Sequence, residues 1–249
     1  MGTQACVLVV VNSADSGPRR LASWLSEAGV DVVIERGECG LPESLDGVHG
    51  LVLLGGGLMP NDYEKAPWLH SERALVEMAI TSDVPTLGIC LGAQIIADVA
   101  GGEVRANFGP KERGSTLISL TPEGERDPLL SALDRSAPMI ENHQDMMTRL
   151  PATATLLASS DAVVNQAFII GKHVRAIQFH PEASAADLAN WDDAALSEDG
   201  YDQAELLARA QADDATGAPQ TRAARLQPPH RLAPSRGGHH FFATTALRA

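Results

Sequence analysis

The stretch that decides the fold is Val84-Pro-Thr-Leu-Gly-Ile-Cys-Leu-Gly-Ala-Gln94. Its first half, residues 84–89, is a short apolar run of the kind that forms a buried strand. The segment after it, residues 92–100, has apolar residues at helical spacing, and two glycines follow and end the predicted helix. Cys90 therefore lies between two glycines at a predicted strand-to-helix turn.

The part of the chain before this stretch shows the same alternation of short strands and helices. We predict strands at residues 6–11, 30–34 and 48–54, and helices that begin at Pro18 and Pro67. Apolar runs rich in β-branched residues are typical of strands that are covered on both faces. The sequence therefore predicts an α/β fold with an open, doubly wound, mostly parallel sheet flanked by helices. Ligands bind such a sheet beyond the carboxyl ends of its strands.

The second half of the chain has shorter strands in closer succession. We expect a hairpin layer and the last strands of the main sheet at residues 115–120, 139–141, 155–158, 166–170 and 174–179. After Trp191 the chain becomes acidic and helical, and it then loses its periodicity in a segment rich in proline and arginine. We therefore predict one domain over residues 1–212 and a disordered tail over residues 213–249.

Composition and charge exclude several classes of function. The 249-residue chain has 19 Lys and Arg against 32 Asp and Glu, a formal net charge of −13, which argues against binding nucleic acid or an anionic membrane. Its three cysteines are widely spaced, and its histidines show no ligand-like spacing, so we expect no disulfide framework, metal site or cofactor. The apolar run near the N-terminus is too short to span a bilayer. We expect a soluble, cytoplasmic protein.

The turn at Cys90 has the form of a nucleophile elbow, in which a sharp bend lifts one side chain out of the sheet. The helix after it offers free N–H groups to a thiolate and to an oxyanion. The alternative is that Cys90 is a small buried hydrophobic residue, as most free cysteines are. A thiol nucleophile needs a base and an orienting acceptor, and Gln178-Phe-His-Pro-Glu182 supplies both at the end of a predicted strand.

Three glycines, Gly55-Gly56-Gly57, follow another predicted strand. They match neither a P-loop, because no Gly-Lys-Ser/Thr follows, nor the dinucleotide fingerprint, because position 60 is Pro. Their N–H groups fit a loop that approaches a reacting carbonyl. A tight turn after a strand explains the glycines equally well.

The segments 88–94 and 178–182 together closely resemble the class I (triad) glutamine amidotransferases, in particular the free-standing domains similar to the amidotransferase domain of GMP synthase. The resemblance covers roughly residues 5–210 and implies a flavodoxin-like fold. It implies that Cys90 attacks the side-chain amide of glutamine and forms a γ-glutamyl thioester. In that scheme His180 transfers the protons and Glu182 orients His180.

The same resemblance implies further roles. The N–H groups of Gly56 and Leu91 would form an oxyanion hole, and the Gln94 side chain would help to bind the substrate. His143 and Asp145 match a His-x-Asp element near the family's site. A role in substrate binding and a purely structural role both remain open for these two residues.

The family produces ammonia for an acceptor, so the resemblance implies that glutamine is the substrate and that the partner is a synthetase or an acceptor subunit. We recognise no synthetase domain or P-loop in this sequence. One alternative is a γ-glutamyl hydrolase or peptidase, which would use the same triad on a γ-glutamyl conjugate. A second alternative is a catalytically silent subunit with a binding or regulatory role. The presence of all three triad residues speaks against it.

Overall fold

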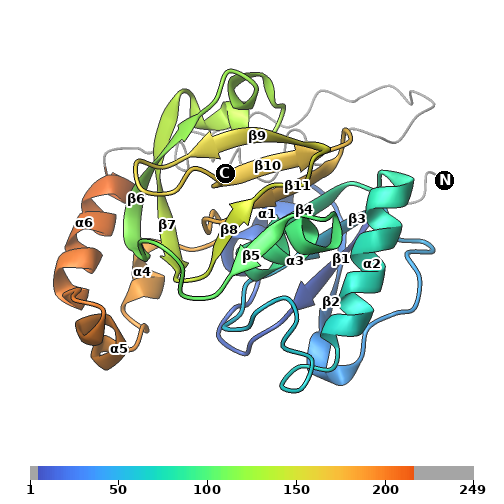
Figure 1. Ribbon diagram of the computed structural model, residues 1–249, viewed down its shortest axis with the longest axis horizontal. Coiled ribbons are helices and arrows are strands. Elements are labelled where there is room, and N and C mark those ends of the chain that lie inside the picture. The colour runs from blue at the N-terminus through green and yellow to red at the C-terminus, as the bar shows by residue number, and fades with distance from the viewer. Residues whose placement is uncertain (1–4, 216–249) are drawn as a thin grey trace.

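The computed structural model describes residues 5–215, which form one nine-stranded sheet with helices on both faces (Figure 1). The strand order is β2-β1-β3-β4-β11-β10-β9-β6-β7. The first five are parallel, namely β2 (Asp31–Arg36), β1 (Cys6–Val11), β3 (Gly50–Leu53), β4 (Thr86–Ile89) and β11 (Val174–Ile177). The other four pair antiparallel, namely β10 (Ala167–Ile170), β9 (Ala154–Ser159), β6 (Glu112–Leu120) and β7 (Ser136–His143). A separate ribbon joins β5 (Glu103–Arg105) to β8 (Met146–Arg149).

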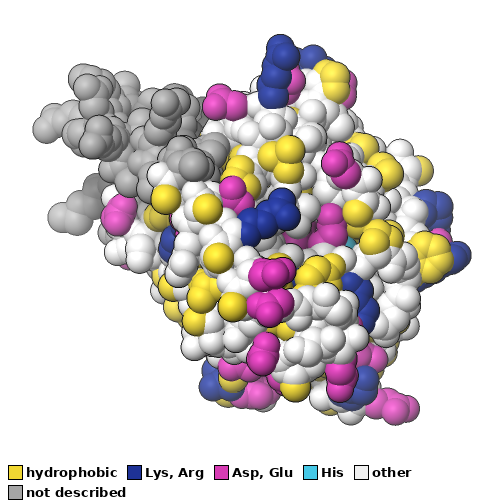
Figure 2. Space-filling view, turned by 90° about the vertical axis from the view of Figure 1, so that its left-hand side faces the viewer, with side chains coloured by type: hydrophobic (Ala, Val, Ile, Leu, Met, Phe, Trp, Pro, Cys, Tyr) yellow, Lys and Arg dark blue, Asp and Glu magenta, His cyan; other side chains and the backbone are white. Residues whose placement is uncertain are grey.

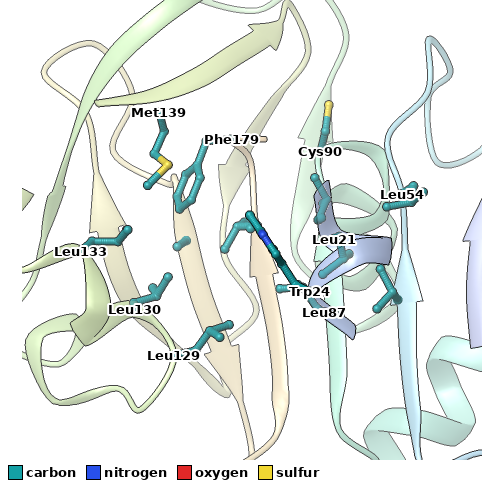
Figure 3. Packing of buried hydrophobic residues seen from close by; sticks show 14 of the residues in the cluster. Leu21, Trp24, Leu54, Leu87, Cys90, Leu129, Leu130, Leu133, Met139 and Phe179 are labelled. Atoms are coloured by element: carbon teal, nitrogen blue, oxygen red, sulfur yellow. The ribbon is translucent and has the colours of Figure 1, made fainter. Parts of the chain in front are cut away.

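Strand β1 shows how the sheet is covered on both faces. Val7, Val9 and Val11 belong to the core beneath α1 (Arg19–Glu27), whereas Leu8 and Val10 belong to the core beneath α2 (Leu69–Ser82) and α3 (Leu91–Val99). Successive side chains of a strand point to opposite faces, so an unbroken apolar run fills both cores. The α1 core contains Trp24 and Leu87, and it extends to the short helical turn Leu130–Leu133 of the antiparallel half (Figure 3). Another short helical turn, Gly124–Arg126, precedes it in the chain.

The C-terminal helices cover the antiparallel half. Helices α4 (Ala185–Leu188), α5 (Asp193–Glu198) and α6 (Gln203–Ala215) follow β11, and a third apolar cluster joins α4 and α6 to Ile140 of β7. The His180 N–H donates to the Ile140 carbonyl at 2.8 Å, and the two residues form an isolated antiparallel bridge. The edge strand β7 therefore reaches the carboxyl end of the last parallel strand, where Cys90 and His180 lie.

The expected α/β fold is confirmed, and most predicted elements are found within a few residues. Strands β6 and β7 are longer than expected. The ribbon β5–β8 was not predicted because its strands, of three and four residues, are too short to show an apolar pattern. Helix α6 continues to Ala215, past position 212, where we placed the end of the domain. The rest of the predicted tail, residues 216–249, lies outside the described residues. Within residues 5–215, every helix is too short or too polar to cross a bilayer.

Candidate active site

The backbone at Cys90 has the strained geometry of an elbow. Cys90 connects β4 to α3 with φ 52° and ψ −107°, a conformation that non-glycine residues rarely adopt. The two flanking glycines are required by space. A Cβ on Gly88 would lie 2.6 Å from Ile96 Cδ1, and one on Gly92 would lie 2.3 Å from the Leu53 carbonyl oxygen. Helix α3 can therefore begin immediately after Cys90 and pack directly on β3.

The Cys90 side chain lies above the apolar core, with its sulfur pointing away from Leu21, Trp24 and Leu87 (Figure 3). The residue is 8% exposed, and its N–H donates to the Ile177 carbonyl at 2.9 Å, which fixes the elbow to β11. The Gln178 side-chain amide donates to the sulfur, with Nε2 3.4 Å from Sγ. Gln178 belongs to the motif that also contains His180, but its contact with the thiol depends on the pairing of β4 with β11.

His180 and Glu182 form a close pair at the end of β11. His180 Nδ1 lies 2.7 Å from Glu182 Oε1, and the side chains are 12% and 5% exposed. Burial disfavours the imidazolium, but the negative charge of Glu182 and the hydrogen bonds of the ring with Cys90 and Glu182 outweigh it, so the pKa of His180 is raised well above its usual value. The imidazole thus has an orienting carboxylate on one side and the thiol within its electrostatic reach.

The turn that carries Glu182 is anchored by α1. The Arg20 N–H donates to the Glu182 carbonyl at 3.3 Å, and the Arg20 guanidinium donates to the Pro181 and Ala183 carbonyls. Buried backbone groups need such partners, since each unpaired one costs free energy. Helix α1 therefore fixes both the apolar floor of the site and the turn that holds its carboxylate.

The glycine loop after β3 lies against the catalytic candidates. A Cβ on Gly55 would lie 3.0 Å from His180 Cε1 and 3.4 Å from Cys90 Cβ, so a larger residue here would press on both side chains. In the described part of the chain, neither the Gly56 N–H nor the Leu91 N–H donates a hydrogen bond to a protein acceptor. Both donors expected from the resemblance are therefore available for a ligand.

A buried polar network supports this loop and was missed in the sequence. Asn12 Nδ2 donates to the Leu54 carbonyl at 3.3 Å and to Glu72 Oε1 at 3.0 Å, and Trp68 Nε1 donates to Asn12 Oδ1 at 3.0 Å. Asn12 follows β1 at its carboxyl end, next to the loop, where a Cβ on Gly56 would lie 3.1 Å from Asn12 Cβ. Burial raises the pKa of Glu72 to about 7, against the opposing effect of the Asn12 hydrogen bond.

The side chains of the other expected site residues form hydrogen bonds with groups of the protein itself. Gln94 is 2% exposed, and its Nε2 donates to Gln178 Oε1 at 3.2 Å and to the Asp145 carbonyl at 3.3 Å. The Asp145 side chain accepts the Asn107 N–H at 2.9 Å. His143 is 3% exposed, and its Nε2 lies 2.9 Å from Glu112 Oε2. Gln94 thus steadies the amide that contacts Cys90, while the other two residues contact structural partners.

His143 belongs to a group of buried polar side chains, Glu112, Glu141 and His143, which we call the polar cluster. Their ligand-type atoms all lie within 4.8 Å of one another. We expected no metal site because the histidines are poorly spaced along the chain. That argument does not cover groups brought together by strand pairing, and the β6–β7 register places Glu112 opposite His143.

A known family matches most of this chain. Residues 9–190 match the class-I glutamine amidotransferases. The chain belongs to this family. It is 36% identical over 177 residues to a subunit of the glutamine-hydrolyzing GMP synthase of Thermoplasma volcanium, and the match covers 70% of this chain and 82% of the relative. It is also 33% identical over 145 residues to γ-glutamyl peptidase 3 of Arabidopsis thaliana, over 55% of this chain and 56% of that protein.

Solved structures of the family have the same fold. A glutamine amidotransferase from Thermotoga maritima superposes with a TM-score of 0.76 at 25% identity, over 86% of this chain and 94% of that one. By contrast, the chain covers only 26% of the length of the glutamine-hydrolyzing GMP synthase of Porphyromonas gingivalis. The amidotransferase unit is therefore what this chain shares with these relatives.

Proposed function

We propose that this class-I glutamine amidotransferase hydrolyses the side-chain amide of glutamine to glutamate and ammonia. The observation that carries the proposal is that an elbow cysteine and a buried His–Glu pair lie together at the carboxyl ends of neighbouring parallel strands. Cys90 lies at the carboxyl end of β4, His180 and Glu182 follow the neighbouring strand β11, and Gly55 packs against both side chains. This is the nucleophile, base and orienter arrangement of a catalytic triad.

In the first half of the reaction, the Cys90 sulfur attacks the amide carbon and a carbon–sulfur bond forms. His180 takes up the thiol proton and delivers it to the leaving nitrogen, so the carbon–nitrogen bond breaks and ammonia departs. Glu182 stabilises the imidazolium that forms between these steps. The free N–H groups of Gly56 and Leu91 stabilise the negative charge on the carbonyl oxygen.

In the second half, water replaces ammonia. His180 removes a proton from water, the hydroxide adds to the thioester carbon, and the carbon–sulfur bond breaks as the thiol regains its proton. Gln178 and Gln94 act as positioning residues, because their amides connect the sulfur to the carbonyl of Asp145. The ammonia then passes to an acceptor enzyme, by analogy with the GMP synthase relatives.

A second candidate is hydrolysis of a γ-glutamyl conjugate, which the similarity to a plant γ-glutamyl peptidase favours. The bond cleaved would again be an amide of the γ-carboxyl, so the triad and the thioester would be the same. The two functions differ only in the leaving amine, which is ammonia in one case and an amino acid or peptide in the other.

The test is to measure release of glutamate from glutamine and from γ-glutamyl dipeptides with the purified full chain. We expect glutamine to be hydrolysed and Cys90→Ala to lose about 10⁴-fold or more of that activity, since the nucleophile is gone. Cys39→Ala removes an exposed thiol and serves as the control that keeps full activity. Faster turnover of the dipeptides would favour the second candidate, and equal rates for wild type and Cys90→Ala would contradict both.

A further inference from the structure

The polar cluster is assembled by the pairing of β6 with β7. Glu112 is the partner of His143 across the two strands, and Glu141 precedes His143 by two residues and so shares its face. His143 Nε2 lies 2.9 Å from Glu112 Oε2 and 3.9 Å from Glu141 Oε2. Two carboxylates and one imidazole therefore face one another inside the protein.

The two carboxylates differ in their hydrogen bonding. Both oxygens of Glu112 have partners, with Ser160 Oγ at 2.7 Å from Oε1 and Gln166 Nε2 at 2.5 Å from Oε2. Glu141 is fully buried, and within residues 5–215 neither of its oxygens accepts a hydrogen bond of regular geometry. His143 Nδ1 is likewise unpaired there. A buried carboxylate without partners is costly, so a positively charged ligand bound directly to Glu141 would stabilise the cluster.

In the rest of the described chain, the charge of His180 acts on Glu141, but His180 forms no hydrogen bond with either oxygen of that carboxylate. Across residues 5–215, no Lys or Arg forms a salt bridge with Glu112 or Glu141. Burial, followed by the charge of Glu112, raises the pKa of Glu141 well above its usual value. The thiol of Cys90 acts in the same direction, whereas the charge of His180 and the Gln166 amide oppose the rise. Protonation would neutralise one carboxyl, but it would still leave a buried acceptor oxygen of Glu141 unpaired.

We propose that Glu112, Glu141 and His143 bind one divalent transition-metal ion, with Zn²⁺ as the best match. Two carboxylate oxygens and an imidazole nitrogen form an accepted Zn²⁺ ligand set, whereas the imidazole disfavours Mg²⁺ and Ca²⁺. Ligand atoms around Zn²⁺ lie about 2.0–2.2 Å from the ion, and thus roughly 3.3 Å apart in a tetrahedron. The separations of 2.9 and 3.9 Å bracket that value, so only small side-chain rotations are required.

The surroundings suit such a site. Ser160 and Gln166 hold the Glu112 carboxylate in place, as supporting residues around metal ligands commonly do. Glu112 also lines a cavity of about 490 Å³ between β6 and α6, whose wall carries both acidic groups (Asp161, Asp202 and Glu205) and basic groups (Lys111, Arg113 and Arg209). Figure 2 shows the side of the molecule that carries α6, where acidic and basic side chains lie next to one another. Glu112 therefore connects the polar cluster to the cavity.

The ion would stabilise β7, the strand that contacts the proposed catalytic residue His180. Ile140, the neighbour of Glu141 on β7, accepts the His180 N–H. A metal that joins β6 to β7 would therefore hold this carbonyl in place beside the active site. This proposal does not depend on the identity of the substrate, because the cluster and the hydrogen bond exist whatever amide is cleaved.

The test uses the full chain, freed of metal by a chelator and titrated with Co²⁺. Its visible spectrum distinguishes nitrogen and oxygen ligands from thiolates. We expect the wild-type protein to bind one more equivalent of Co²⁺ than Glu141→Gln does. The spectrum of this additional Co²⁺ should show ligand-field bands but no thiolate charge-transfer band. The matched control Glu77→Gln, which removes an exposed carboxylate from α2, should titrate as wild type does. Zn²⁺ should displace the bound Co²⁺ and raise the melting temperature of wild type but not of Glu141→Gln.

Several results would overturn the metal site. The first is that wild type and Glu141→Gln bind the same number of Co²⁺ equivalents. The second is a thiolate charge-transfer band for the additional Co²⁺ of wild type, and the third is that wild type shows no saturable Co²⁺ binding. Metal-free Glu141→Gln should melt no lower than wild type, because the substitution removes an unpaired buried carboxylate. If it does not fold, Glu112→Gln takes its place in the same titration, and retention of the extra equivalent by that variant would also exclude the site.

Discussion

The parallel and antiparallel halves of the sheet bury different kinds of side chain near the carboxyl ends of β4 and β11. The parallel half is filled with aliphatic side chains, and its chemistry depends on a strained backbone at Cys90 between two tightly packed glycines. The antiparallel half buries the polar cluster, in which one carboxylate is fully hydrogen-bonded and the other is not. His180 joins the halves, since it follows a parallel strand and donates to the Ile140 carbonyl of β7.

The difference shows how each half positions its buried functional side chains. In the parallel half, close contacts around the backbone fix the position of Cys90, so the local sequence must supply glycines. In the antiparallel half, side chains from different strands must meet, so the pairing register decides which charges face one another. A change at the packed glycines should therefore act through packing alone, whereas a change at a buried charged side chain in either half should depend on pH.

The largest effect is expected at the junction, for Glu182→Gln. The variant keeps the shape of the side chain but removes the negative charge that raises the pKa of His180. We expect glutamine hydrolysis to fall by about 10³-fold or more, as when the orienting carboxylate of a triad is neutralised. At high pH, activity is lost as the imidazolium of His180 deprotonates. Because the variant lowers the pKa of His180, the basic limb of the pH–rate profile should move to lower pH.

The stability of the same variant gives an independent check. The raised pKa of His180 contributes stability that is fully present below about pH 6.5 and is lost as pH rises through the higher pKa of the folded protein. Glu182→Gln should reduce this contribution, whereas Glu198→Gln, which changes an exposed carboxylate, should not. A slower enzyme with an unshifted basic limb would indicate that Glu182 acts only through packing.

The sequence predicts the strands of both halves, but it predicts the candidate site of the parallel half much better than the polar cluster of the antiparallel half. A strand, an elbow and a helix follow one another within residues 84–100, so the positions of Cys90 and Leu91 follow from local pattern. His180 and Glu182 are likewise neighbours in the chain. The polar cluster could not be predicted, because Glu112 precedes the expected start of its strand and faces His143 only in one register. Asn12 was missed because a single Asn after a strand carries no signal of the distant Glu72.

A smaller effect is expected for Glu72→Gln, the buried carboxyl of the parallel half. Its pKa of about 7, against 4.5 for an ordinary carboxyl, means that the folded state is fully stabilised below about pH 4.5 and loses stability as pH rises to about 7. The total loss is about 3 kcal/mol. The Gln variant cannot ionise, so its free energy of unfolding relative to wild type should rise by up to this amount between pH 4.5 and 8.

Urea unfolding at several pH values measures this difference, with Glu77→Gln on the exposed side of the same helix as the control. The amide of the Gln variant can still accept the Asn12 hydrogen bond, so the glycine loop should stay in place and glutamine hydrolysis should change little. A difference between variant and wild type that is independent of pH would show that Glu72 is ionised in the folded protein throughout.

The smallest effect separates packing from charge directly. In Gly92→Ala, the new methyl group would lie 2.3 Å from the Leu53 carbonyl oxygen and 2.8 Å from the Leu53 carbonyl carbon, so the backbone of β3 or α3 must move. We expect a loss of about 2 kcal/mol in the free energy of unfolding, the same at pH 5 and pH 8, because no titratable group is involved. Gly57→Ala is the matched control, because its Cβ meets no atom within 4 Å, and its stability should stay within about 0.5 kcal/mol of wild type. If Gly92→Ala were as stable as Gly57→Ala in urea, the helix after the elbow would have room to move, and the close backbone contact could not be what fixes Cys90.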